Sequence, residues 1–307
     1  LARATSGAAA TLLGKIYLRN HDYANAKTYI DMVLNSGQYE LESDFKYVWS
    51  ENNKYGKEMI FALLHETGNN AAEIACHFGP SDHPEVPGRW QYYGVSLPFW
   101  RSYDKEDPRR EFFYYDYTGD AKRDDQSDYG FHYMVPEEGV TVVPNDTTKY
   151  MQNVATMKYT YDMISDAYYD GRTICIFRLS DVILCKAEIE NNLNGPAAAL
   201  PYLNQIRARA GAPEYGKHNR FPAPSTKEAM NDAILKERGY ELVFEFQRRA
   251  DLIRFGKYEE VVNAHLKKLG IAQPTNVTSS LRYFPYPLND AQLNPNLAAE
   301  NPSRLPK

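Results

Sequence analysis

The first apolar positions of the chain recur with the period of an α-helix, and they do so twice with a polar break between them. The break is Asn20-His21-Asp22, and the spacing on either side predicts an antiparallel helix pair within residues 8–39. Gly14 and Ala26 are small enough for the two helices to approach closely, as in a tetratricopeptide repeat. The apolar positions of the pair are Ala9, Leu12, Leu13, Ile16, Tyr17, Ala26, Ile30, Val33 and Leu34.

A second helix pair with similar spacing is predicted for residues 176–211. Its first helix runs from Ile176 to Asn191, and its second covers about 197–210 and ends at Gly211, which suits a C-cap. Two separated pairs are too few for a free-standing solenoid, because each repeat buries its apolar face only against its neighbours. We therefore expect further repeats before residue 1.

Residues 66–172, between the two pairs, lack a strong period and are interrupted by proline and glycine. They hold two of the three tryptophans, and long loops inside a compact domain are commonly functional. We predict a loop-rich excursion here. The fold class expected for the chain is all-α, a tetratricopeptide-like helical repeat scaffold with long irregular loop excursions.

The most regular charged pattern lies in residues 226–255, which we predict to be a helix beginning at Thr226 with Glu228 in its first turn. The tail, 276–307, is rich in Pro and Asn and is expected to be extended.

Three glutamates of the charged helix are spaced four residues apart and share one helical face. A di-metal site would need Glu-x-x-His pairs, and a glycosidase needs carboxylates facing each other across a cleft, so neither pattern fits. Arg249 lies four residues after Glu245, and Arg238 is near enough to pair with an acid such as Asp181. We predict a structural, partly buried ion-pair network that includes Glu237, Arg238, Glu241, Glu245, Arg249 and Asp251.

Composition excludes several classes of protein. The net charge is −5 without a basic run, which disfavours a nucleic-acid partner, and no apolar stretch is long enough to cross a bilayer as a helix. The three cysteines have neither disulfide-framework nor metal-site spacing. Tyrosine is the outlier, with 25 residues, and its flat face and polar tip suit a recognition surface as well as helix packing.

Signals for catalysis are missing. The seven histidines form no HExxH pattern, and the chain has no dinucleotide or phosphate-binding glycine motif. His77, Asp82 and His83 come nearest to a metal-ligand group, but we expect no metal, no cofactor and no catalytic residues.

Four segments, in order, resemble the SusD/RagB family of outer-membrane nutrient-binding lipoproteins. The most diagnostic is the charged block from Glu237-Arg238 through Arg248-Arg249-x-Asp251-Leu252 to Gly256. The others are Arg178-Leu179-Ser180-Asp181 leading to Ala187-Glu188, Asn204-Gln205-Ile206-Arg207-Ala208-Arg209-Ala210-Gly211, and the tail motifs Phe284-Pro285-Tyr286-Pro287, Asn294-Pro295-Asn296-Leu297 and Asn301-Pro302.

The resemblance implies a single SusD-like domain over residues 1–307 that lacks its N-terminal portion. It implies an outward-facing lipoprotein of the outer membrane, held by a lipid anchor outside this chain, since the signal and the lipidated cysteine are not in it. It also implies a glycan ligand, which the protein captures for import, and a SusC-like TonB-dependent transporter as partner.

A glycan site needs aromatic faces for the sugar rings and polar groups for their hydroxyls. The Pro/Gly-bounded loop from Pro87 to Arg101 concentrates both, in a position similar to a ligand-binding insertion of the family. The predicted ligand-binding residues are the aromatic Trp90, Tyr92, Tyr93 and Trp100 and the hydrogen-bonding Arg89 and Gln91. The alternative for Trp100, with Phe99, is that it packs the excursion onto the scaffold, and packing is also expected for Trp49.

Two other functions remain open. Some family members capture peptides, and a tetratricopeptide scaffold that binds another protein is a further possibility. A scaffold would carry its repeats in uninterrupted tandem, whereas here an aromatic excursion of about a hundred residues separates them.

Overall fold

The computed structural model describes residues 3–66, 72–86, 89–119, 130–138, 148–162, 171–268, 277–278, 284, 286–294 and 296–297. By its internal contacts the chain divides into two compact units, Leu1–Glu245 and Phe246–Lys307, and the single SusD-like domain over 1–307 stays a prediction. Each unit is described by itself.

The N-terminal unit begins with a helical hairpin made of α1 (Ser6–Arg19) and α2 (Tyr23–Leu34). The side chains of Thr5 and Asp22 cap the two helices by accepting hydrogen bonds from backbone N–H groups of the first turn. At Gly14 the helices lie so close that a Cβ would be 2.8 Å from Cδ1 of Ile30. The absence of a side chain at this position therefore permits the packing.

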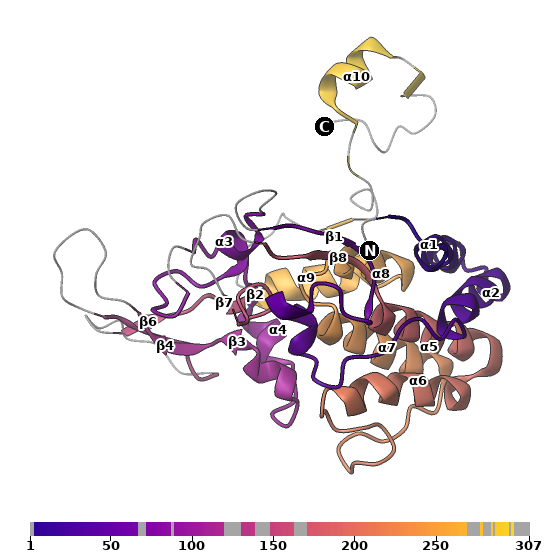
Figure 1. The fold of residues 1–307 in the computed structure, drawn as a ribbon, viewed down its shortest axis with the longest axis horizontal. Helices are drawn as coiled ribbons and strands as arrows, with labels where there is room; N and C mark the ends of the chain where they lie inside the picture. The colour runs from indigo at the N-terminus through magenta and orange to yellow at the C-terminus, as the bar shows by residue number, and fades with distance from the viewer. Residues whose placement is uncertain are drawn as a thin grey trace. The chain divides into compact units, whose positions relative to one another are not determined.

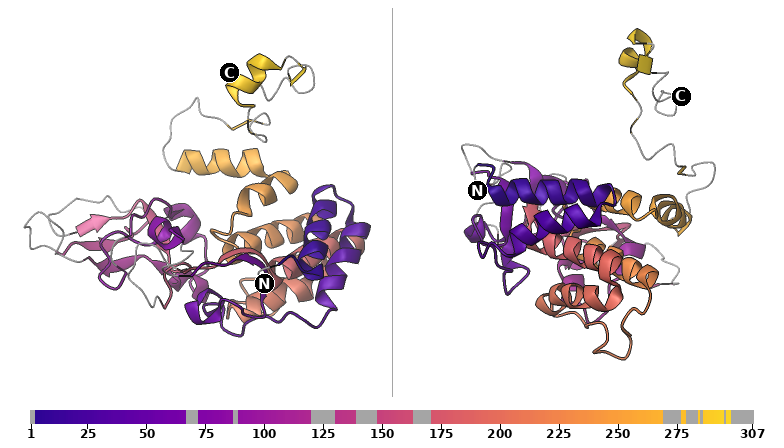
Figure 2. Two further views of the ribbon diagram at one scale, coloured as in Figure 1. Left: turned by 45° about the horizontal axis from the view of Figure 1, so that its top comes forward. Right: turned by 90° about the vertical axis from the view of Figure 1, so that its right-hand side faces the viewer.

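A second hairpin, α5 (Leu179–Asn194) and α6 (Pro196–Arg209), forms the middle of the same unit. Helix α5 packs against α2 on one side and against α6 and α7 (Lys227–Glu241) on the other (Figures 1 and 2). Thirteen residues of α5 are buried, which is expected for a helix covered by neighbours on several faces. The predicted helix-rich, tetratricopeptide-like fold class is confirmed.

A two-stranded antiparallel sheet precedes the second hairpin. Strand β8 (Ile174–Arg178) pairs antiparallel with β1 (Met59–Leu63) and continues directly into α5. This strand is why the helix begins at Leu179 rather than near 176 as predicted.

The excursion 66–172 contains two further small sheets on the opposite side of the unit from α1 and α2 (Figure 1). In one, β7 (Asn153–Thr156) lies between β2 (Val95–Ser96) and β3 (Phe113–Tyr114). In the other, β5 (His132–Met134) lies between β4 (Asp116–Thr118) and β6 (Thr148–Tyr150). The short helices of this half of the chain are η1 (Tyr47–Trp49), η2 (Glu51–Asn53), α3 (Ile74–Phe78), α4 (Leu97–Arg101) and η3 (Pro108–Glu111).

The charged segment 226–255 was predicted to be one helix, but it forms two. Helix α7 ends at Glu241, and α8 (Arg248–Arg254) starts only after a turn. In that turn Phe244 and Phe246 have left-handed backbones, with φ of 60° and 61°. In a longer helix, the backbone carbonyls of this turn would accept hydrogen bonds from later N–H groups. Here they accept hydrogen bonds from side chains instead. Lys158 donates to the Glu241 carbonyl at 2.8 Å, and Tyr159 donates to the Phe244 carbonyl at 2.9 Å.

The C-terminal unit contains α8, α9 (Tyr258–Lys268) and α10 (Leu288–Leu293). Within it, the Arg249 guanidinium lies over the rings of Tyr258 and Phe284, at 5.4 and 4.7 Å from their centroids. Helix α10 falls in the tail 276–307, which was predicted to be extended. Pro287 at its N-cap position and Asp290 in its first turn are compatible with a helix start. Among the residues that the structure describes, no helix is both long and apolar enough to cross a membrane.

Candidate functional site

The loop that follows α3 is fastened to that helix by its backbone. The N–H of Trp90 donates to the Cys76 carbonyl at 2.8 Å, and the N–H of Tyr93 donates to the His77 carbonyl at 3.1 Å. Between them Gln91 has a left-handed φ of 49°. The loop is therefore held in one conformation by α3 rather than by its own side chains alone.

Three aromatic rings of this loop gather around the imidazole of His77. The His77 ring centroid lies 5.1 Å from Trp90, 5.5 Å from Tyr92 and 6.3 Å from Tyr93. Trp90 and Tyr92 also contact each other, at 5.3 Å between centroids. We call Trp90, Tyr92, Tyr93 and His77 the aromatic platform.

The platform is open to solvent although it is aromatic. Tyr92 is 66% exposed and Tyr93 is 54% exposed, while Trp90 is half-buried. In the described part of the chain, neither tyrosine hydroxyl has a hydrogen-bond partner. Exposed aromatic groups clustered on a protein surface commonly mark a binding site, and these present both apolar faces and free hydroxyls.

Arg89 and Gln91, which were predicted to form hydrogen bonds with the ligand, instead contact other residues of the protein. Arg89 is 1% exposed, and its guanidinium reaches the Cys76 thiol at 3.5 Å, so its side chain is directed into the protein and away from any surface ligand. Gln91 accepts from the Ser81 N–H at 3.2 Å and donates to the Asn153 side chain at 3.0 Å. The prediction that Arg89 binds the ligand is therefore corrected, and Gln91 is engaged in holding the loop.

Trp100 is likewise removed from the predicted site. It is 5% exposed, and its indole N–H donates to the Arg110 carbonyl at 3.2 Å. The Arg110 guanidinium lies 4.0 Å from the Trp100 ring. Trp100 belongs to a core cluster with Val95, Tyr103, Phe113, Val154 and Tyr240, which is the packing alternative considered for it.

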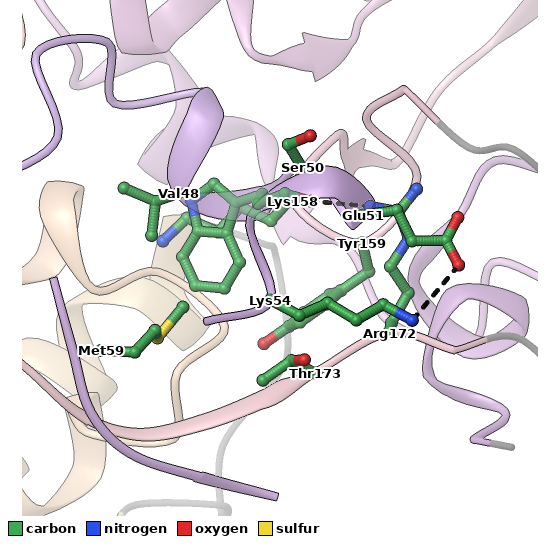
Figure 3. A pocket seen from close by; sticks show the side chains of 10 residues that line it. Val48, Ser50, Glu51, Lys54, Met59, Lys158, Tyr159, Arg172 and Thr173 are labelled. Atoms are coloured by element: carbon green, nitrogen blue, oxygen red, sulfur yellow. Dashed lines mark hydrogen bonds and ion pairs between the residues drawn. The ribbon is translucent and has the colours of Figure 1, made fainter. Parts of the chain in front are cut away.

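A pocket beside Trp49 is shown in Figure 3 and belongs to the packing of the unit. Trp49 is buried, and the Lys158 ammonium lies 4.6 Å from its ring centroid. The Arg172 guanidinium donates to the carbonyls of Trp49 and Tyr161, at 2.6 Å each. Two cations that line the pocket, Lys158 and Arg172, thus already donate hydrogen bonds to carbonyl groups of the protein.

A large ion-pair network lies buried where α6, α7, β8 and the excursion meet. In the described part of the chain it joins the carboxylates of Glu58, Asp107, Glu237, Glu241 and Glu245 to the cationic groups of Arg109, Lys158, Arg178, Arg207 and Arg209. The charges balance, five against five. Burying a charge costs free energy because the charge loses its hydration, and pairing each charge with an opposite one offsets this cost.

Arg178 is the hub of this buried ion-pair network. Its guanidinium donates five hydrogen bonds, one for each N–H that it has, and so leaves none unsatisfied. The acceptors are the carboxylates of Glu58, Glu241 and Glu245 and the Glu241 carbonyl, all at 2.6–2.9 Å. Burial alone would raise the pKa of Glu241, but Arg209, Arg178 and Arg109 hold that pKa well below its usual range.

The sequence predicted three acids of this network, Glu237, Glu241 and Glu245, but neither Glu58 nor Asp107 and none of the main cationic partners. Glu245, expected beside Arg249, is bound by Lys158 at 2.7 Å and by Arg178 at 2.7 Å. Arg238 pairs with Asp181 at 2.7 Å, apart from the network, and Asp251 pairs with Arg254 at 3.1 Å in the C-terminal unit. The partners that were missed come from β8, α6 and the excursion, and nothing in local spacing identifies them.

The Asp181 pair predicts how stability depends on pH. Burial would raise the pKa of Asp181, but the nearby cations Lys15 and Arg238 dominate and lower it below its usual value of 3.8. Because the pKa of Asp181 is lower in the folded state than in the unfolded state, its carboxylate stabilises the folded state at any pH above the unfolded-state pKa. This stabilisation is lost as the pH falls through the folded-state pKa. We expect Asp181→Asn to cost about 3 kcal/mol at pH 7 and clearly less at pH 3. Urea unfolding at both pH values measures this difference, and a difference that grew on acidification would contradict the assignment.

His77, Asp82 and His83, which came nearest to a metal-ligand group in the sequence, each contact different residues in the structure. His83 lies between the rings of Tyr114 and Tyr117, at 4.7 and 4.8 Å, and burial lowers its pKa. Asp82 accepts a hydrogen bond from the Tyr133 hydroxyl at 2.7 Å, and His77 lies in the platform. Among the residues that the structure describes, no three His, Cys, Asp or Glu side chains are arranged to hold a metal ion.

The sequence profile of the SusD family matches residues 57–303, which is most of the chain and includes both the aromatic platform and the buried network. This chain belongs to the SusD family. Its relatives include SusD-like protein P25 of Formosa agariphila, 39% identical over 39% of this chain and 22% of the relative. Another is the starch-binding protein SusD of Bacteroides thetaiotaomicron, 28% identical over 44% of this chain and 22% of that protein.

Solved structures of SusD-type proteins have the same fold. Surface glycan-binding protein A from Bacteroides thetaiotaomicron, in complex with laminarihexaose, superposes with a TM-score of 0.67 at 20% identity. The superposition covers 94% of this chain and 62% of that one. This chain spans between 22% and 58% of the length of the curated relatives that it matches.

Proposed function

We propose that this chain captures a glycan at the cell surface and that the aromatic platform is the contact surface for the sugar. The observation that carries the proposal is the open cluster of Trp90, Tyr92 and Tyr93 around His77. Sugar rings present C–H faces that pack on aromatic faces, and their hydroxyls match the free phenol groups. One relative is named a starch-binding protein, and a protein with a similar fold has been solved in complex with laminarihexaose, which supports a saccharide ligand.

The carboxylates of the buried network are not arranged as those of a glycosidase are, which favours binding without catalysis. A glycosidase needs two carboxyl groups that flank a bound sugar, one of which can deliver a proton. The acids of the buried network are instead paired with arginine and lysine inside the protein. We propose a capture protein rather than an enzyme.

The family membership further supports a role in import. We propose that the captured glycan passes to a SusC-like TonB-dependent transporter and that the protein faces outward from the outer membrane, held by a lipid anchor outside this chain. Capture of a peptide, or of a protein by the helical repeats, remains an outcome of the binding test.

The test compares two exposed tyrosines that differ only in position. Tyr92, in the platform, is 66% exposed, and Tyr55, outside it, is 65% exposed, so alanine removes a similar aromatic surface at either site. We expect Tyr92→Ala to weaken glycan binding about tenfold and Tyr55→Ala to leave it unchanged.

Affinity electrophoresis through gels that contain starch, laminarin, a sulfated polysaccharide or a uronic-acid polysaccharide measures both variants, and a peptide library gives the second ligand class. Equal retardation of the two variants, or retention of peptides but of no polysaccharide by the wild type, would refute the proposal.

A further inference from the structure

The aromatic platform has a polar centre. The imidazole of His77 contacts all three aromatic rings of the platform, standing edge-on to Trp90 and Tyr92 and roughly parallel to Tyr93. Packing among aromatic rings requires no nitrogen atom, whereas each imidazole nitrogen needs a hydrogen-bond partner or contact with solvent.

The backbone fixes which ring nitrogen carries the proton. Nδ1 of His77 lies 2.7 Å from the carbonyl oxygen of Glu73, one turn earlier at the start of α3. A carbonyl oxygen only accepts hydrogen bonds, so Nδ1 must be the protonated nitrogen. In the neutral ring, Nε2 is then left with a lone pair and acts as an acceptor.

Nε2 has no partner inside the described part of the chain. Every hydrogen bond of His77 there is accounted for by Nδ1 and the backbone, and Nε2 is not among the buried polar atoms that lack a partner. It is therefore in contact with solvent. The titratable side chains that face the ring are the phenols of Tyr92 and Tyr93, and the nearby Arg89 guanidinium is turned inward to Cys76.

We infer that Nε2 of His77 accepts a hydrogen bond from a hydroxyl of the sugar that packs on the platform. The inference rests on the proposed function and makes it more specific. Flat aromatic surfaces hold many apolar faces equally well, whereas a fixed acceptor among them selects a ligand with an O–H group at the edge of its ring. The class of ligand is thus a saccharide with a free ring hydroxyl.

The experiment replaces His77 by phenylalanine, which keeps a ring among the three aromatic groups and removes both nitrogens. Using each neutral polysaccharide of the panel that the wild type retains, we expect His77→Phe to bind about two- to tenfold more weakly at pH 8. His77→Gln, whose amide oxygen is an acceptor, should recover part of the affinity.

His218→Phe is the matched control, since His218 is also a partly exposed histidine that contacts an aromatic ring, Phe221. It should keep the affinity of the wild type. If His77→Phe bound like the wild type while Tyr92→Ala failed to bind, the inference would be wrong and the proposed function would stand. Unchanged binding by both His77→Phe and Tyr92→Ala would overturn the inference and the proposed function together.

Discussion

Replacement of Arg178 by methionine is expected to destabilise the N-terminal unit by about 3–5 kcal/mol. Methionine has a similar length but no charge, so Glu58, Glu241 and Glu245 would each lose a partner while remaining buried. Removing one partner of a buried pair is costly because the remaining charge is left without compensation. The measurement is equilibrium unfolding in urea at pH 7.

Two further variants show whether the effect comes from the buried network. Arg220 also forms a two-pronged ion pair, with Asp104, but it is 49% exposed, so Arg220→Met should cost less than about 1 kcal/mol. Arg178→Lys keeps the charge but cannot form five bonds in a plane, and an intermediate loss is expected. Equal losses in Arg178→Met and Arg220→Met would show that burial of the network has no energetic consequence.

Trp90→Ala is expected to cause the largest loss of glycan affinity, about ten- to a hundredfold. Trp90 offers the largest aromatic face of the platform and also supports Tyr92, whose centroid is 5.3 Å away. The substitution therefore removes one stacking surface and loosens another. Isothermal titration with the polysaccharide retained by the wild type measures the change.

Folding has to be separated from binding in this variant, because Trp90 is half-buried. Its backbone bond to the Cys76 carbonyl does not involve the side chain, so we expect the loop to remain attached to α3. Trp90→Phe, which keeps a smaller ring, should retain part of the affinity. A variant that melts like the wild type and binds like the wild type would exclude Trp90 from the site.

The helix pairs were predictable because their signals are local. The apolar spacing and the Asn20-His21-Asp22 break specify α1 and α2 within about thirty residues, and Asp22 is itself the cap of α2. The end of α7 was not predictable in this way. Its termination depends on Lys158 and Tyr159, which are more than eighty residues away in sequence and satisfy the carbonyls of the turn.

The candidate site stays a prediction, and its side-chain arrangement could not be predicted residue by residue. Composition drew attention to the loop that carries Trp90, Tyr92 and Tyr93, yet it gave no information on which side chains face inward. Arg89 precedes Trp90 directly and is nonetheless buried, because it fills space beside α3 and Gly79. His77 precedes the first ring of the loop, Trp90, by thirteen residues, and its proposed role follows only from the contacts of α3 with that loop.

The most direct test of the central claim is a crystal structure of the protein with an oligosaccharide of the polysaccharide that it retains. The account predicts a sugar ring packed on Trp90 and Tyr92, with a hydroxyl within hydrogen-bonding distance of Nε2 of His77. An oligosaccharide bound elsewhere in the protein, with the platform left in contact with solvent, would contradict it.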